Sequence, residues 1–319
     1  MVALQFAFIV DPLPSLKPRK DSSIAMMRAA AARGHSVWAI RREDIFWRES
    51  GVSACAVPLA LHAGDEGWYE EGEPETRLLT AFDAVLMRQD PPFDFEYLTA
   101  TWLLERALMD GARVFNHPRA VRDHSEKLSI AEFAGSVPVP DTLVACDPTR
   151  LHAFIAEVGD AILKPLDGMG GSQIFRVTAH DPNRNVIVET LTQQGTRTIM
   201  AQRYLPGVRE GDKRVLLIGG QVVPYALARI PCEGETRANL AAGGRGVAMA
   251  LTTKEREIAD FLAPILWERG LLIVGLDMIG GHLTEINVTS PTCMVEIAAQ
   301  KGFDVAGLVV ETLERLCGQ

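Results

Sequence analysis

The sequence contains few cysteines, and they are not grouped. Its 319 residues include five, at positions 55, 146, 232, 293 and 317, and no two of them form a C-x-x-C motif. An odd number of scattered cysteines argues against a disulfide framework and against a cysteine zinc site. We expect reduced, mostly buried thiols and a cytoplasmic location, because the cytosol keeps free thiols reduced.

Long hydrophobic runs and an excess of positive charge are also missing. In the second half of the chain the longest run without a charge covers residues 215–228, which is shorter than the about 20 residues that a membrane-spanning helix needs. The stretch before Asp11 carries no basic side chain, so we expect no signal peptide. The 32 Lys and Arg against 41 Asp and Glu give a net charge of −9, so we expect neither a nucleic-acid partner nor a membrane partner.

The first part of the chain alternates between predicted strands and predicted helices. The stretches "ALQFAFIVDP" and "HSVWAI" predict strands, and "SSIAMMRAAAARG" between them predicts a helix with Ser22 or Ser23 as its N-cap. Such alternation is typical of an α/β domain with a parallel sheet. The acidic, glycine-containing stretch over 64–75 predicts a loop.

From about residue 123 the pattern changes to hairpins. Asp123 and Glu126 have the spacing of a capping box at a helix start. Three pairs of apolar runs, at 161–177, 214–230 and 272–288, turn at glycines, and helices are expected over about 150–158, 255–269 and 304–316. The second part is therefore predicted to be α+β, with antiparallel sheets.

A glycine-rich turn follows a lysine in the first hairpin, "ILKPLDGMGG". It lacks the Gly-Lys-Ser/Thr of a P-loop, and Gln173 interrupts a G-x-G-x-x-G pattern. Bare glycine backbone at a hairpin tip can close over an anion, although an ordinary flexible turn has the same composition. Lys164 favours an anion, because an unpaired lysine in an apolar strand is costly and a polyphosphate would pair with it. Lys127 is a candidate second contact, with a solvated helix lysine as the alternative.

Two carboxylates can face each other in the third hairpin, "GLDMIGGHLTEIN". If residues 280–282 form its turn, Asp277 lies opposite Glu285, with Asn287 on the same face. Opposed carboxylates repel, a divalent cation removes the repulsion, and oxygen ligands of this kind suit Mg²⁺ shared with phosphates. A two-residue turn would place the carboxylates on opposite faces. A solvated hairpin with incidental acids is the alternative.

Two nearby segments could complete a ligand site. Ser290 followed by Pro291 predicts the N-cap and first residue of a helix, whose free N–H groups could hold a substrate carboxylate. Plain helix capping is the alternative. The long stretch 229–247 is rich in glycine and contains Arg237 and Arg245, which is typical of a lid that closes over phosphate. A surface loop without a catalytic role is the alternative there.

Together these motifs resemble the ATP-grasp fold, and more closely the bacterial type of glutathione synthetase. The matching stretches run from residue 11 to 293 and include "ILKPLDGMGGSQIFRV", "GDKRVLLIGGQVVPYALARIP", "GETRANLAAGGRG" and "GLDMIGGHLTEINVTSPTC". The resemblance implies an α/β N-terminal domain with a parallel sheet over 1–122, followed by an α+β ATP-grasp fold of two lobes with antiparallel sheets. Those lobes would cover 123–203 and 204–319, with a lid loop at about 230–246 and ATP between them.

The resemblance also implies an activity and its participants. ATP, γ-glutamylcysteine and glycine would become glutathione, ADP and phosphate through an acyl phosphate. The implied cofactors are ATP as co-substrate and Mg²⁺, as two ions with Mn²⁺ as an alternative metal. The implied assembly is a homotetramer.

Roles for individual residues follow from the same motifs. The ATP-binding residues would be Lys127, Lys164, Gly168, Met169, Gly170, Gly171, Gln202, Tyr204, Leu205 and Asp212. The metal ligands would be Asp277, Glu285 and Asn287, and the catalytic cations Arg214 and Arg229. The substrate contacts would be Arg88, Ser290, Pro291 and Thr292, and the lid residues Arg237, Gly243, Gly244 and Arg245.

Two other functions stay open at this point. Another ATP-grasp carboxylate–amine ligase, acting on D-alanine or on a peptide terminus, would share every ATP-binding residue. Only Arg88, the lid and the N-terminal domain would then differ. A nucleotide-binding module without turnover is the second alternative, and the intact set of Asp277, Glu285, Asn287 and Arg229 argues against it.

Overall fold

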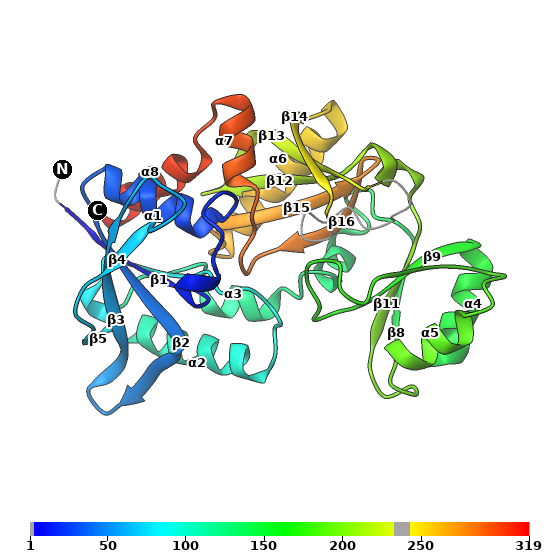
Figure 1. The fold of residues 1–319 in the computed structure, drawn as a ribbon. Helices are drawn as coiled ribbons and strands as arrows, with labels where there is room; N and C mark the ends of the chain where they lie inside the picture. The colour runs from blue at the N-terminus through cyan, green and yellow to red at the C-terminus, as the bar shows by residue number, and fades with distance from the viewer. Residues whose placement is uncertain (1–2, 233–242, 319) are drawn as a thin grey trace.

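The computed structural model describes residues 3–232 and 243–318, which are arranged around three β-sheets (Figure 1). The N-terminal part of the chain forms a mixed sheet, the middle part a small antiparallel sheet, and the C-terminal part a larger antiparallel sheet. In Figure 1 the small sheet and its helices lie at the end of the molecule opposite the N-terminal sheet. The division at residues 122 and 203 stays a prediction.

The N-terminal sheet contains the predicted parallel strands and an antiparallel extension. Its strands are β1 (Gln5–Ile9), β2 (Ser36–Arg48), β3 (Gly51–Leu61), β4 (Tyr69–Glu71), β5 (Glu75–Leu78), β6 (Ala84–Met87) and β7 (Val114–Phe115). Strands β2, β1, β6 and β7 are neighbours in this order and run parallel. Strand β3 pairs antiparallel with β2, β4 and β5, so part of the loop expected over 64–75 is strand instead.

Helices cover both faces of this sheet. They are α1 (Ser22–Ala32), α2 (Phe95–Met109) and α3 (Pro118–Asp123), with the short 3-10 helices η1 (Leu13–Ser15) and η2 (Leu79–Ala81). Successive residues of a strand point to opposite faces. In β1, Phe6 and Phe8 pack in the core that contains α1, whereas Ala7 and Ile9 pack in the core that contains α2.

Two predicted helix starts are wrong. Helix α1 is capped by Asp21 rather than by Ser22 or Ser23, because the Asp21 carboxylate accepts from two backbone N–H groups of the first turn, at 2.7 and 2.9 Å. Asp123 is the last residue of α3 and does not begin a helix. Its expected capping-box partner, Glu126, precedes the 3-10 helix η3 (Leu128–Phe133) and hydrogen-bonds with residues 286–289 instead.

The middle sheet is antiparallel and has a core of its own. Its strands, in spatial order, are β10 (Phe175–Thr178), β9 (Asp160–Pro165), β11 (Ile199–Arg203) and β8 (Thr142–Ala145). The predicted helix at 150–158 is α4 (Pro148–Val158), and a second helix, α5 (Arg184–Leu191), covers the same face. Leu163 and Val177 of the predicted first hairpin are buried against these helices.

The C-terminal sheet contains the other two predicted hairpins. Its strands, in spatial order, are β14 (Arg245–Ala250), β13 (Gln221–Ile230), β12 (Asp212–Ile218), β15 (Ile273–Ile279) and β16 (His282–Asn287), with the 3-10 helix η4 (Pro206–Glu210) before β12. Helix α6 (Thr253–Glu268) packs on the face that carries Val215 and Leu217. Helices α7 (Met294–Lys301) and α8 (Val305–Cys317) pack on the face that carries Leu216 and Ile218.

The N-terminal and C-terminal sheets share their cores. One apolar cluster contains buried residues of α2 and α6, and the other contains buried residues of α1, α7 and α8. From the middle sheet, the buried Met200 belongs to the first of these clusters, and the partly buried Val144 and the adjoining Leu166 pack against it. Among the helices in the described parts of the chain, none is both long enough and apolar enough to cross a membrane.

Candidate active site

A cavity of about 560 Å³ opens where side chains of the middle and C-terminal sheets meet the N-terminal part of the chain. It is bounded by the glycine-rich tip of the β9–β10 hairpin, by the acidic β15–β16 hairpin and by loops of the N-terminal part. Of the residues predicted from sequence, its lining contains Lys127, Lys164, Gly168, Met169, Gly170, Gly171, Arg214, Arg229, Asp277, Glu285, Asn287, Ser290, Pro291 and Thr292. Residues far apart in the sequence are thus brought to one site.

Other predicted site residues lie elsewhere. Arg88, Gln202, Tyr204, Leu205, Asp212, Gly243, Gly244 and Arg245 do not line this cavity. Gln202 donates its amide N–H to the hydroxyl of Thr142 at 3.1 Å, and the guanidinium of Arg176 lies 3.8 Å from the centre of the Tyr204 ring. Of the predicted lid, Arg237 lies outside the described residues.

Asp277 and Glu285 lie opposite each other, as predicted, but in a different register. The turn has two residues, Gly280 and Gly281, so Ile279 pairs with His282, and the three-residue turn is wrong. A β-bulge follows, which leaves Thr284 as the extra residue and restores the pairing of Asp277 with Glu285. The hydroxyl of Thr284 donates to the carbonyl of Asp277 at 3.0 Å.

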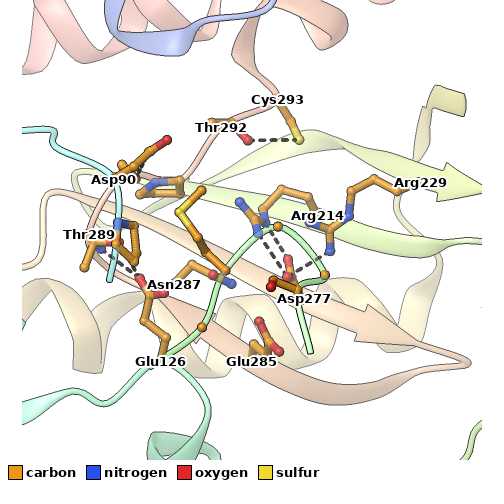
Figure 2. A pocket seen from close by; sticks show the side chains of 18 of the residues that line it. Asp90, Glu126, Arg214, Arg229, Asp277, Glu285, Asn287, Thr289, Thr292 and Cys293 are labelled. Atoms are coloured by element: carbon orange, nitrogen blue, oxygen red, sulfur yellow. Dashed lines mark hydrogen bonds and ion pairs between the residues drawn. The ribbon is translucent and has the colours of Figure 1, made fainter. Parts of the chain in front are cut away.

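Asp277 is paired with two buried arginines (Figure 2), and Glu285 is paired with the buried Lys164. Lys164 Nζ lies 2.9 Å from Glu285 Oε1. Arg214 donates to both oxygens of Asp277, with 2.9 Å between Nη2 and Oδ2. Arg229 Nη2 lies 2.8 Å from the same Oδ2. The cations needed to hold a polyphosphate are therefore present and directed at the proposed metal ligands.

Neighbouring strands create this arrangement. Strand β12 lies between β13 and β15, and its register places Asp212 opposite Arg229 and Arg214 opposite Asp277. Arg229 Nη2 also lies 2.6 Å from Asp212 Oδ2. Residues 212 and 214 are two apart on one strand, so their side chains share a face. The sheet thereby gathers two arginines and two aspartates in one row, and three of them, Arg214, Arg229 and Asp277, line the cavity.

The protonation of these acids differs. Burial opposes ionisation of Asp277, but Arg214 and Arg229 outweigh it and hold the pKa of Asp277 well below its usual range. Burial likewise opposes ionisation of Glu285, and Lys164 lowers the pKa of Glu285. Burial raises the pKa of Asp212 to about 6, although Arg229 opposes this shift. The two proposed metal ligands are thus carboxylates at neutral pH.

The glycine-rich tip is joined to Lys127. This side chain is 5% exposed, and its ammonium donates to the carbonyl of Gly168 at 2.6 Å. The alternative of a solvated helix lysine is therefore wrong. Gly170 and Gly171 have φ of +64° and +83°, a conformation that side chains other than glycine rarely adopt. The tip can thus bring bare backbone close to a ligand in the cavity.

The wall formed by residues 289–293 is irregular rather than helical. The predicted helix start at Ser290 is wrong, because α7 begins at Met294 and its N-cap residue, Cys293, makes no side-chain capping bond. Ser290 Oγ instead donates to Asp90 Oδ1 at 2.5 Å. Arg88 lies behind this wall, 4% exposed, and its Nη2 donates to the carbonyl of Pro291 at 2.9 Å.

Sequence reasoning missed several residues that line the cavity. They are Asp11, Lys17, Lys20, Asp21, Asp90, Glu126, Thr289, Cys293 and Glu296, among others. Asp90 lies two residues after Arg88, and Glu126 directly precedes Lys127. Both were visible as neighbours of predicted residues. Lys17 and Lys20 lie in an exposed loop and carry no comparable signal.

The donor set fits a hard divalent cation shared with phosphates. Asp277 and Glu285 supply carboxylate oxygens, and Asn287 Nδ2 donates to the carbonyl of Gly275 at 3.3 Å, which leaves its amide oxygen for a ligand. Across residues 3–232 and 243–318 no three His, Cys, Asp or Glu side chains cluster as a metal cage. Mg²⁺ needs no such cage, because it is usually bound by one or two carboxylates plus substrate phosphates.

The fold and the site define an ATP-grasp ligase. The structure of D-cycloserine synthetase DcsG has the same fold, with a TM-score of 0.68, 18% identity and coverage of 98% of this chain and 99% of that chain. Within this class, the chain belongs to the prokaryotic glutathione synthetase family. The model of that family's N-terminal domain matches residues 4–122, and the model of its ATP-grasp domain matches residues 126–302.

Relatives in this family are similar over nearly the whole chain. A glutathione synthetase of Ralstonia nicotianae is 56% identical over 316 residues, which cover 99% of this chain and 97% of the relative. A glutathione synthetase of Nitrosomonas europaea is 57% identical over 315 residues, which cover 98% of each. A second ATP-grasp structure, the ligase PsnB with a minimal precursor, has a TM-score of 0.65 at 20% identity and coverage of 98% of this chain and 99% of that chain, and thus shares the fold.

Proposed function

We propose that this chain is an ATP-dependent ligase that joins γ-glutamylcysteine and glycine to form glutathione, with release of ADP and phosphate. The observation that carries the proposal is the row of buried charges at the cavity, where Lys164, Arg214 and Arg229 face Asp277 and Glu285. Such a row suits a polyphosphate and its metal ion. Its occurrence in a chain of the prokaryotic glutathione synthetase family supports this substrate pair.

The phosphates of ATP would lie between the glycine-rich tip and the acidic hairpin. Lys127, Lys164 and residues 168–171 would hold them, since ammonium groups and bare backbone N–H groups bind phosphate oxygens. Gln202, Tyr204 and Leu205 are proposed to bind adenine at the end of β11 and in the segment that follows it. Asp212 is proposed as a ribose contact, and its buried Oδ1 has no hydrogen-bond partner among the described residues.

Asp277, Glu285 and Asn287 are proposed to hold Mg²⁺, as two ions, with Mn²⁺ as an alternative. A divalent cation bound there would neutralise charge on the phosphates. Lys164 and Arg214 now pair with the same carboxylates. In the nucleotide complex these cations would turn to phosphate oxygens, so the carboxylates become free to act as ligands.

The reaction would proceed in two displacement steps without a protein nucleophile. A carboxylate oxygen of the cysteinyl group attacks the γ-phosphorus, the bond to the bridging oxygen breaks, and ADP leaves an acyl phosphate. The glycine amine then attacks the acyl carbon and loses a proton, and phosphate leaves. Because negative charge accumulates in both steps, Arg214 and Arg229 would act by electrostatic stabilisation.

The remaining roles concern substrate selection and water. Arg88 and residues 290–292 are proposed to recognise substrate carboxylates. Arg237, Gly243, Gly244 and Arg245 are proposed to belong to a lid that keeps water from the acyl phosphate. We also propose a homotetramer in the cytoplasm, with small molecules rather than nucleic acid or membranes as partners.

The test is ADP release by the purified protein with ATP and Mg²⁺. Sustained release is expected only when γ-glutamylcysteine and glycine are both present, and mass spectrometry should then find glutathione. Sustained release with D-alanine or with a peptide in place of these substrates would favour another ATP-grasp ligase. ATP binding without any product would contradict an enzymatic function.

A further inference from the structure

The segment that follows β16, residues 288–291, is held by polar side chains from the N-terminal part of the chain. It connects the proposed metal ligand Asn287 with the proposed substrate wall. Three of its contacts, with the donor first, are Asn116 Nδ2 to Val288 O (2.8 Å), Ser290 Oγ to Asp90 Oδ1 (2.5 Å) and Arg88 Nη2 to Pro291 O (2.9 Å). The position of this segment therefore depends on side chains that are distant in sequence.

Glu126 makes more of these contacts than any of the other three side chains. Its Oε1 accepts from the N–H of Val288 at 2.9 Å, from the N–H of Thr289 at 3.0 Å and from Thr289 Oγ1 at 2.7 Å. Its backbone carbonyl accepts from the N–H of Ile286 at 2.8 Å. Figure 2 shows the carboxylate directed at Thr289, beside Asn287.

These bonds replace a missing neighbouring strand. Strand β16 is at the edge of its sheet, so the N–H groups on its outer side have no strand partner. Ile286 and Val288 are two residues apart, and their N–H groups point to the same side. Glu126 satisfies both, one with its backbone and one with its side chain. Buried or half-buried backbone N–H groups need such partners.

The same residue adjoins the phosphate-binding side of the cavity. Lys127 follows directly, and its ammonium reaches the carbonyl of Gly168 in the glycine-rich tip. Ile286, to which Glu126 is bonded, lies between the proposed metal ligands Glu285 and Asn287. One residue thus fixes the distance between the backbone that carries Lys127 and the strand that carries two metal ligands.

We infer that Glu126 is a positioning residue, which holds Lys127 and the ligand-bearing end of β16 in the relative placement that phosphoryl transfer requires. It would act through the 286–289 backbone rather than by touching a reacting atom. Hydrogen bonds to a carboxylate are stronger than those to a neutral acceptor, and here three converge on one oxygen. Misplacement of a reacting group by about 1 Å can slow an enzyme by about 10²-fold.

The experiment compares Glu126→Ala and Glu126→Gln with the wild type. The amide oxygen of glutamine can still accept hydrogen bonds, whereas alanine cannot. We expect Glu126→Ala to lower kcat by about 10²-fold while the KM values change little, and Glu126→Gln to recover most of that loss. In the unliganded protein, hydrogen–deuterium exchange of a peptide covering 286–292 should be about tenfold or more faster in Glu126→Ala, and near wild type in Glu126→Gln.

Glu132→Ala is the matched control. Glu132 lies in the same segment, in η3, but its carboxylate pairs with Arg269 rather than with residues 288–289. It should leave both kcat and the exchange of 286–292 unchanged. An equal loss of kcat in Glu126→Gln and Glu126→Ala, with a raised KM for one substrate, would overturn the inference in favour of direct substrate contact. Unchanged exchange in Glu126→Ala would also overturn it.

The turnover readout rests on the proposed function, whereas the exchange readout does not. If the protein catalyses a different ligation, kcat is measured with that substrate pair and the exchange prediction stands unchanged. If Glu126→Ala lowers the melting temperature but keeps the wild-type kcat at a temperature where it is folded, the residue is merely structural and the inference is wrong.

Discussion

Lys164 and Glu285 form an ion pair of 2.9 Å between Nζ and Oε1, although they are 121 residues apart in the chain. Lys164 belongs to β9 in the middle sheet, and Glu285 belongs to β16 in the C-terminal sheet. The pair thus joins the two lobes across the cavity. In the proposed complex each residue exchanges its ion-pair partner for a ligand. Lys164 would then bind a phosphate, and Glu285 would bind a metal ion.

We expect Lys164→Met to lower kcat/KM for ATP by about 10²-fold, because a charge that stabilises the transferring phosphate is lost. Steady-state kinetics with ATP as the varied substrate measure this effect. Lys301→Met is the control, since Lys301 is exposed at the end of α7. Wild-type kcat/KM for ATP in Lys164→Met would contradict the assigned role.

Arg229→Ala should lower turnover by about 10²-fold or more, as the loss of one donor at a developing charge often does. Arg229 is 5% exposed and paired with Asp212 and Asp277. The matched control is Arg256→Ala, which removes an exposed pair with Asp260 on α6. Near-normal turnover of the folded Arg229→Ala protein would remove this residue from the proposed mechanism.

Glu285→Ala should abolish turnover at every Mg²⁺ concentration while ATP is still bound. One of the two carboxylate ligands is lost, but the adenine segment and the glycine-rich tip are unchanged. Turnover is measured against Mg²⁺ concentration, and nucleotide binding by calorimetry. Glu257→Ala, at an exposed position of α6, is the control. Full activity of Glu285→Ala would rule out the proposed metal site.

The acid stability of the protein should depend on Glu314 at the end of α8. The hydrogen bond from Arg33 has the largest effect on the pKa of Glu314; burial opposes it, the hydrogen bond from His35 adds to it, and the pKa is lowered to about 2. A carboxylate with a depressed pKa stabilises the folded state above its unfolded pKa, and this contribution is lost as the pH falls through the folded value. The contribution should therefore be complete at neutral pH and decline between about pH 4.5 and about pH 2.

Urea unfolding of the wild type and Glu314→Gln at several pH values measures this dependence. The difference between their free energies of unfolding should be largest above pH 4.5 and vanish near pH 2. The control is Glu311→Gln, at an exposed position of the same helix. A difference that does not change between neutral pH and pH 2 would show that the charge of Glu314 is not what stabilises the fold.

Strand pairing could be predicted from the sequence, but its register only in part. The pairing of Asp277 with Glu285 was expected from a three-residue turn, whereas the molecule reaches it through a two-residue turn and a bulge at Thr284. Two glycines permit either turn. The bulge is accompanied by a hydrogen bond from Thr284 to the carbonyl of Asp277, and the hydrophobic pattern of the sequence does not reveal such a bond.

The helix-capping predictions were wrong where residues distant in sequence form hydrogen bonds with the same polar groups. Ser290 and Pro291 have the chemistry of a helix start, but Asp90 accepts from the serine hydroxyl and Arg88 donates to the proline carbonyl. Glu126 has the spacing of a capping box, but the edge of β16 offers it N–H groups instead. Capping rules describe neighbours in sequence, and these partners come from other elements.

The middle sheet has a consequence for motion, because its apolar face is closed by α4 and α5 alone. A body whose interior is complete can rotate against the rest of the molecule without exposing that interior to water. The contacts that such a rotation would break include the apolar packing of Met200, Val144 and Leu166 and the hydrogen bonds of Lys127 and Lys164. We therefore expect the cleft to open for product by separation of these contacts, and the ammonium groups of Lys127 and Lys164 to help hold it closed on nucleotide.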